Sequence, residues 1–224
     1  MLIAEDLVLL VFDDETGKPV SGASNLEYAL AGALLIELAT HGRVDVTDES
    51  AKKPGRLTVG DTSPLGHPVL DDALAKLSTM DGKKPKDAIS PLSGDNLSGR
   101  LLEALAERGV LRKEKGKVLG LFPTTSWPAE DSRHEEQVRA GLHRVLVDGG
   151  KPTEREGALI SLLAAIDLAE KTIEGPDPKL VKSRAKEIAE GNWASEAMRK
   201  AVEEVTAAVM VAIMVPTVIM TTNT

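Results

Sequence analysis

The sequence predicts a mainly α-helical protein, with residues 1–224 forming a single helical domain, a helical bundle that carries two short β-hairpins. Apolar residues recur at the three- and four-residue spacing of helices, as at Val69, Leu70, Ala73, Leu74 and Leu77. No linker is long enough to divide the chain, and no internal repeat is visible. Aromatic residues make up only 2% of the 224 residues. Aliphatic side chains must therefore build the core.

The first half of the chain predicts three helices and one hairpin. An opening helix covers residues 2–10, and an apolar helix covers 25–41, with Ser24 or Asn25 as its cap and Gly42 just past its end. Residues 44–46 and 56–59 are strand candidates, and the turn-forming segment 52–55 favours a hairpin between them. A helix over 69–80 precedes a loop over 81–86.

The second half predicts one hairpin among five helices. A helix over 97–108 stops at Gly109, and a hairpin over 110–122 turns at Lys115 and Gly116. Four consecutive helices then cover residues 132–147, 154–173, 179–190 and 195–215.

Glu37 is the one carboxylate inside the apolar stretch Gly32-Ala33-Leu34-Leu35-Ile36-Glu37-Leu38-Ala39. Burying a carboxylate is costly unless it is paired or hydrogen-bonded. We therefore expect Glu37 to be buried against a fixed polar partner. Because buried pairs stabilise little in net terms, we expect leucine to replace Glu37 at little cost.

The composition and motifs predict a protein that is not an enzyme and holds no cofactor or metal. There is no cysteine, which excludes disulfides and thiolate chemistry and fits a cytoplasmic location. No phosphate-cradling glycine loop is present, and no two of the four histidines have close ligand spacing. His134, Glu135 and Glu136 are adjacent on a predicted helix and are expected to form a solvated acidic face.

The C-terminal segment is apolar and uncharged from Val205 to Met220 apart from Thr206, Pro216 and Thr217. It is too short for a membrane span and its proline would kink it, so we expect a buried helix that ends near Pro216. Val218, Ile219 and Met220 are expected to pack on the domain or on a neighbouring subunit, which makes a homo-oligomer one expected assembly.

The helix over 97–108 and the hairpin after it resemble a winged helix, which makes a DNA-binding regulator the alternative function. The helix carries Arg100 and Arg108 against Glu103 and Glu107, so its net charge is zero, whereas the wing is basic. The net charge of −8 argues against nucleic acid as the main partner.

Six blocks along the chain, in this order, resemble the Golgi phosphoprotein 3 family. They are the opening helix with the acidic turn over 13–17, residues 32–43, 66–74, 101–111, 139–149 and 158–165. The resemblance implies a helical protein related to those that, in eukaryotes, bind phosphatidylinositol 4-phosphate on the cytosolic face of Golgi membranes. It therefore predicts a non-enzymatic adaptor, cytoplasmic or peripheral on the cytosolic face of a membrane, with an anionic phospholipid or a protein as its partner.

The residues that hold the phosphoinositide headgroup in the eukaryotic branch, a tryptophan and three arginines, are not matched. The aligned positions carry Gly22, Ala31, Asp95 and Ser98, and only the nearby Arg100 remains as a lipid-binding candidate. We expect any membrane binding to be weak and not selective for the 4-phosphate. The pattern resembles a bacterial-type member of the family.

Four residues are candidates for membrane contact. Trp127 lies on a proline-flanked loop, where its ring could anchor at a membrane interface or fold over an edge of the core. The family inserts an apolar hairpin into membranes. The stretch that corresponds to it over 172–182 contains Ile173, Leu180 and Val181 among charged residues.

Overall fold

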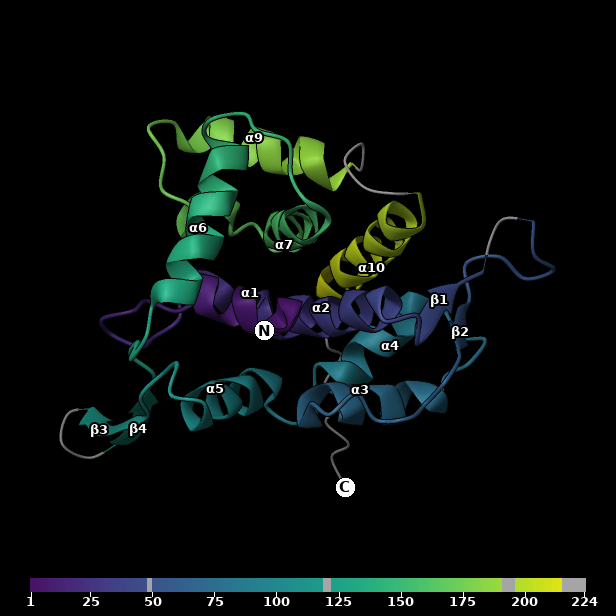
Figure 1. Ribbon diagram of the computed structural model, residues 1–224, viewed down its shortest axis with the longest axis horizontal. Coiled ribbons are helices and arrows are strands. Elements are labelled where there is room, and N and C mark those ends of the chain that lie inside the picture. Colours follow the sequence, from purple (N-terminus) through teal and green to yellow (C-terminus); the bar gives the residue numbers. More distant parts are fainter. Residues whose placement is uncertain (48–49, 119–121, 191–195, 215–224) are drawn as a thin grey trace, which may run out of the picture.

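The computed structural model describes residues 1–47, 50–118, 122–190 and 196–214 and confirms the mainly helical class (Figure 1). Short antiparallel hairpins lie at two ends of the helical body. The helices are α1 (Ile3–Val11), the 3-10 turn η1 (Ala23–Asn25), α2 (Leu26–Thr40), α3 (Pro68–Ser78), α4 (Pro85–Leu92), α5 (Leu97–Glu107), α6 (Arg133–Leu146), α7 (Glu154–Ala165), α8 (Ala169–Thr172), α9 (Pro178–Ala189) and α10 (Glu196–Met214). The strands are β1 (Val44–Val46), β2 (Leu57–Val59), β3 (Glu114–Val118) and β4 (Phe122–Ser126).

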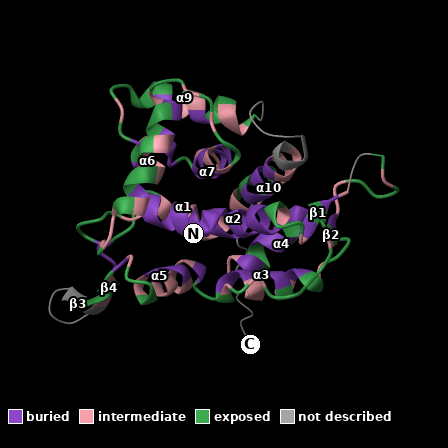
Figure 2. Ribbon diagram, viewed as in Figure 1, coloured by how far each residue is buried: buried purple, intermediate pink, exposed green. Residues whose placement is uncertain are grey.

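Helix α2 is the centre of the core. Its residues are buried on every side from Ala29 to Leu38, and α1, α4, α5, α7 and α10 all pack against it. Figure 2 shows buried positions running along both α1 and α2. At Gly32 a Cβ atom would lie 2.8 Å from Cγ2 of Val209 and 3.1 Å from Cδ2 of Leu162. The missing side chain lets α10 and α7 approach α2 closely.

Glu37 is buried and has a fixed partner, as the sequence predicts. Its Oε2 accepts a hydrogen bond of 2.7 Å from the backbone N–H of Ile3, the first residue of α1. Arg155 Nη1 lies 3.9 Å from the same oxygen, and His41 Nε2 lies 3.6 Å from Oε1. Because the first N–H groups of a helix have no partner within the helix, Glu37 acts as a cap supplied by a neighbouring helix.

Two further buried carboxylates complete this polar cluster at the start of α1. Glu5 accepts from the backbone N–H of Leu2 at 2.8 Å and faces His67 Nε2 at 3.0 Å, with Arg108 also bound to it. Burial alone would raise the pKa of Glu5. The hydrogen bonds with His67 and Leu2 and the charge of Arg108 lower it below its ordinary value.

Asp6 is held by the second half of the chain. Its Oδ1 lies 2.7 Å from Nε2 of His134 in α6, and its Oδ2 accepts from Nε of Arg155 in α7 at 2.8 Å. Helices α6 and α7 are therefore fastened to α1 through a charged group that is itself buried.

Three details of the predicted secondary structure are wrong. The second hairpin pairs Glu114 with Ser126 and Gly116 with Thr124, so the predicted turn at Lys115 and Gly116 lies inside β3. The predicted helix over 154–173 breaks between α7 and α8, where Asp167 adopts a left-handed backbone (φ 57°). Helix α4 occupies a stretch for which no helix was predicted.

Helix α10 matches the predicted helix over 195–215 to within one residue at each end. Val205, Ala208 and Val209 are buried against the core, whereas Met210, Val211 and Met214 are exposed. The expectations for Pro216 and for Val218, Ile219 and Met220 fall on residues outside the described part of the chain. Among the described helices, none is both long and apolar enough to cross a membrane.

Candidate functional site

A hollow of about 450 Å³ opens between three parts of the chain beside α5. The loop after α1 forms one wall, the N-terminal half of α5 forms the second, and the β3–β4 hairpin with Trp127 forms the third. Its lining residues are Phe12, Gly17, Lys18, Pro19, Asn96, Ser98, Gly99, Arg100, Leu102, Glu103, Lys113, Thr125 and Trp127. The structure thus brings together two residues that the sequence singled out separately, Arg100 and Trp127.

The α5 hollow is lined by more positive than negative side chains. The positive charges of the lining come from Lys18, Arg100 and Lys113, and its carboxylate comes from Glu103. Arg100 Nη1 donates to Oδ2 of Asp72 at 2.9 Å. Lys113 is bonded to Glu103, and its Nζ lies 5.1 Å from the centroid of the Trp127 ring. Two of the three cations are therefore already engaged by neighbours.

The loop wall is fastened to the Trp127 backbone at a glycine. Gly17 has a positive φ of 60°, and a Cβ atom there would lie 2.1 Å from the backbone nitrogen of Trp127. The same nitrogen donates to the carbonyl oxygen of Gly17 at 2.9 Å. Only glycine fits this contact, and it places the neighbouring Lys18 at the mouth of the hollow.

The N-terminus of α5 would be the natural anion-binding end of this wall, but a carboxylate already occupies it. Glu27 of α2 accepts from the backbone N–H of Ser98 at 3.2 Å and from the Ser98 hydroxyl group. The exposed donors of a helix start usually attract phosphate. Here an external phosphate would have to displace Glu27.

The four positions aligned with the eukaryotic headgroup residues offer no free donor side chain. Ala31 is buried inside α2, and Gly22 lies at the start of η1, where a Cβ atom would lie 2.5 Å from Nζ of Lys171. Asp95 accepts from Nζ of Lys76 at 2.9 Å, and Ser98 is bound to Glu27 as described. Arg100, the predicted lipid-binding residue, lines the hollow, and so does Ser98.

The candidates for membrane contact are placed differently from one another. Trp127 is 8% exposed, which corresponds to the ring folded over the core edge, and Ile173 and Val181 are buried. Leu180, at the start of α9, is 40% exposed. Its side chain is therefore the only one of these four that the described surface presents to a membrane.

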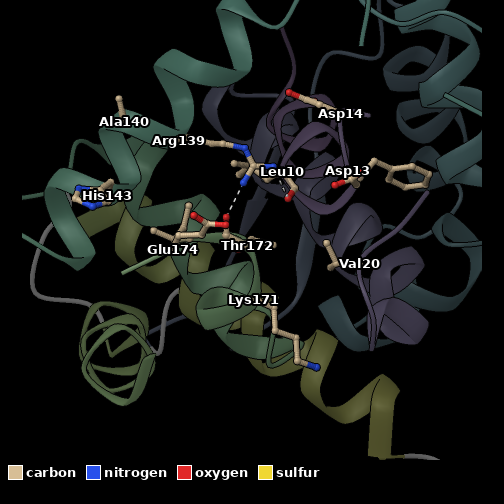
Figure 3. A pocket seen from close by; sticks show the side chains of 12 residues that line it. Leu10, Asp13, Asp14, Val20, Arg139, Ala140, His143, Lys171, Thr172 and Glu174 are labelled. Atoms are coloured by element: carbon tan, nitrogen blue, oxygen red, sulfur yellow. Dashed lines mark hydrogen bonds between the residues drawn. The ribbon is translucent and has the colours of Figure 1, made fainter. Parts of the chain in front are cut away.

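A second hollow of about 500 Å³ lies between the loop after α1, α6 and the end of α8 (Figure 3). Arg139 points into it, but its three donor nitrogens serve Glu135, the Thr172 carbonyl and the Leu10 carbonyl. The carboxylates of Asp13, Asp14 and Glu174 also line it. This larger hollow is therefore less suited to binding an anion than the α5 hollow is.

The prediction that His134, Glu135 and Glu136 form a solvated acidic face on α6 is wrong for Glu135. Its side chain is buried behind the second hollow, whereas Glu136 is exposed. Burial and a hydrogen bond with the Asp14 side chain raise the pKa of Glu135 to about 8, against the opposing charge of Arg139. His134 also departs from the expected face, because it binds Asp6. No three histidine or acidic side chains within the described ranges converge as a metal site would require.

Several cations of the predicted winged helix pair with carboxylates of the protein. Arg108 binds Glu5, Lys113 binds Glu103, and Arg112 binds Glu114 and Glu130. Because phosphate contacts need available positive charge, this face is poorly suited to DNA.

Sequence reasoning missed Lys18, Lys113 and Glu27 as parts of the site. Lys113 belongs to the basic wing that the sequence predicts, and no local motif marks the other two. Their roles arise because the loop after α1 and the start of α2 meet α5 in space.

Comparisons with known proteins support the family resemblance of the sequence. The sequence matches the family Golgi phosphoprotein 3 (GPP34) over residues 3–205. It is 30% identical over 169 residues to "Vacuolar protein sorting-associated protein 74" of Eremothecium gossypii, covering 66% of this chain and 49% of the relative. It is 24% identical over 163 residues to the protein of the same name of Schizosaccharomyces pombe, covering 65% and 48%.

The chain thus spans about half the length of the curated relatives it matches. The family match, in contrast, runs through nearly the whole chain, from α1 into α10. The six blocks that resemble the family, the central helix α2, helix α5 and the β3–β4 hairpin all lie inside that match to within one residue. The chain belongs to the Golgi phosphoprotein 3 (GPP34) family.

Proposed function

We propose that this protein is a non-enzymatic adaptor that attaches peripherally to the cytosolic face of membranes through anionic phospholipid headgroups, with the α5 hollow as the headgroup site. The observation that carries the proposal is the lining of that hollow, where Lys18, Arg100 and Lys113 meet at one opening. A phosphorylated headgroup needs such charge-assisted donors. Family membership supports the same class of ligand.

Binding at this site is weak and has little preference among phosphoinositide isomers. Arg100 and Lys113 must share their donors with Asp72 and Glu103, and Glu27 covers the helix start beside them. A selective site would require donors aimed at one phosphate position, which the residues at the aligned family positions do not supply here. The hollow attracts a phosphate without fixing its orientation.

Flotation with phosphatidylcholine vesicles that contain one phosphoinositide at a time tests the proposal. Vesicles with the 3-, 4- or 5-monophosphate should bind the full chain to within a few-fold of one another. Arg100→Ala and Lys18→Ala should each lower the apparent affinity by about tenfold, the value of one charged hydrogen bond. Arg133→Ala is the matched control, because that arginine is exposed and pairs only with Asp131 among described carboxylates.

Two results would contradict the proposal. The first is submicromolar binding that prefers the 4-phosphate isomer by more than tenfold. The second is an unchanged affinity in Arg100→Ala and Lys18→Ala when circular dichroism shows both variants to be folded.

A further inference from the structure

The C-terminal end of α10 exposes an apolar patch. Met210, Val211 and Met214 are 38%, 41% and 77% exposed, and among the described residues the other large apolar side chains this exposed are Met1 and Leu180. Three of five such side chains therefore gather within five residues of one helix. Grouped exposed apolar side chains mark interaction surfaces, whereas isolated ones do not.

A hollow of about 280 Å³ continues the patch at Val211. Its apolar lining comes from Pro54 and Pro85 and from Ala207, Ala208 and Val211 of α10. Lys84 and Lys86 also line it, and Glu204 is the carboxylate among its lining residues. The lining of the hollow thus combines apolar side chains with two ammonium groups.

Further lysines that form no ion pair with the described carboxylates lie beside this hollow. Lys52 and Lys53 precede Pro54, and Lys83 precedes Lys84; all are exposed. Over the described part of the chain, no carboxylate pairs with any of these five lysines, whereas Lys76, Lys113 and Lys182 all form ion pairs.

The two lysine-bearing loops are held together by the backbone. The N–H of Leu57 donates to the carbonyl of Lys83 at 2.8 Å, and the N–H of Gly82 donates to the carbonyl of Leu57 at 2.8 Å. The nearby carboxylates Asp81 and Asp87 accept from backbone N–H groups of Val59 and Lys84. The lysines are therefore presented from a fixed base.

We propose that this α10 surface, formed by Pro54, Lys84, Lys86, Met210, Val211 and Met214, lies against an anionic phospholipid bilayer. Its apolar side chains would enter the interfacial region while the lysines meet the lipid phosphates. A bilayer fits this combination better than a protein, because lysine is depleted from protein interfaces. The net charge of −8 repels the rest of the molecule from the same bilayer.

The inference rests on the proposed membrane attachment, but the α10 surface shares no residue with the α5 hollow. Flotation of the full chain with phosphatidylcholine–phosphatidylserine vesicles that lack phosphoinositides separates the two. Lys84→Ala/Lys86→Ala should lower the partition coefficient about 30-fold, because two lysines near an anionic bilayer usually strengthen binding by about that factor. Met210→Ser/Met214→Ser should lower it as well. Lys151→Ala/Lys186→Ala is the control with the same change in charge.

The expected pattern is loss in both α10-surface variants and retention in the control and in Arg100→Ala. Three outcomes overturn the inference: no wild-type flotation on these vesicles at 50 mM salt, equal flotation of all variants, or loss in Arg100→Ala alone. If Met210→Ser/Met214→Ser changes only the sedimentation of the free protein, the surface binds a second copy and the inference is equally overturned. Failure of isomer binding at the α5 hollow would leave these results unaffected.

Discussion

At the scale of single residues, Glu37 has a role that its sequence position does not reveal. Its position inside an apolar helix indicates a buried carboxylate with a partner, but it leaves the partner open. The partner is the first N–H of α1, with Arg155 nearby. Leucine at this position would leave that N–H buried and without an acceptor, so the expectation of a nearly neutral replacement no longer holds.

We predict that Glu37→Leu lowers the free energy of unfolding by about 1–3 kcal/mol, the cost of a buried donor without a partner. Glu37→Gln should lose less, because the amide oxygen can still accept from Ile3. Urea unfolding of both variants measures the difference. Equal stability of Glu37→Leu and the wild type would show that the α1 cap is dispensable.

Glu135 makes a second prediction, for pH dependence. Its folded pKa of about 8 exceeds the ordinary 4.5, so the folded protein holds a proton that the unfolded chain releases between these pH values. The contribution of this group to stability therefore falls as pH rises from about 4.5 to about 8. Glu135→Gln has no carboxyl proton to release, so its stability lacks this contribution to the pH dependence.

The melting temperature of Glu135→Gln, relative to that of the wild type, should accordingly rise between pH 6 and pH 8. Glu136→Gln on the exposed neighbour is the control and should show no such trend. A relative melting temperature that stays flat over this range would mean that Arg139 keeps Glu135 ionised in the folded protein.

At the scale of elements, the contact between α2 and α10 depends on Gly32. We predict that Gly32→Ala destabilises the protein by about 1–2 kcal/mol, because overpacking exceeds the roughly 1 kcal/mol that alanine gains in a helix. Val209→Ala removes the nearest obstructing methyl group. Gly32→Ala should therefore cost less in a Val209→Ala background, which a double-mutant cycle by chemical unfolding measures.

The long helices and the first hairpin were predictable because each has a local signal. Helix α4 was missed since it is short, begins at Pro85 and contains Pro91. The break before α8 has no glycine or proline, and only the backbone of Asp167 marks it. The turn of the second hairpin was predicted wrongly because Lys115-Gly116 is typical of a tight turn. The strand pairing in fact extends beyond it to Val118 and Phe122.

The site was predictable only in part, for a reason that belongs to the same scale. Arg100 was found because it lies near the positions aligned with the family's headgroup residues, and Trp127 from its rarity and its place on a loop. Nothing local says that Lys18 shares a hollow with them, because that depends on how the Gly17 turn docks on the Trp127 backbone. Tertiary packing also buried Ile173 and Val181, for which the correspondence with the family's membrane-inserting hairpin had suggested a membrane contact.

At the scale of the whole molecule, the described core reaches to Val209, while the apolar sequence continues to Met220. We predict that deleting residues 217–224 leaves the cooperative unfolding transition intact, because the buried part of α10 ends before the deletion. The same deletion should change the oligomeric state or the solubility. Analytical ultracentrifugation and thermal unfolding of both lengths check this. Retention of the full chain on membranes after carbonate washing would instead show that this segment is an anchor.

The cluster at the start of α1 also affects how the chain folds during synthesis. The side chains that bind Glu5 and Asp6 include residues 103, 128 and 149 positions further along the chain. A nine-residue helix is too short to persist alone in water, and its carboxylates lack their partners Arg108, His134 and Arg155 until those residues have been synthesised. The first helix of the nascent chain therefore lacks these contacts until about two thirds of the protein has been synthesised. Until then it is exposed to chaperones.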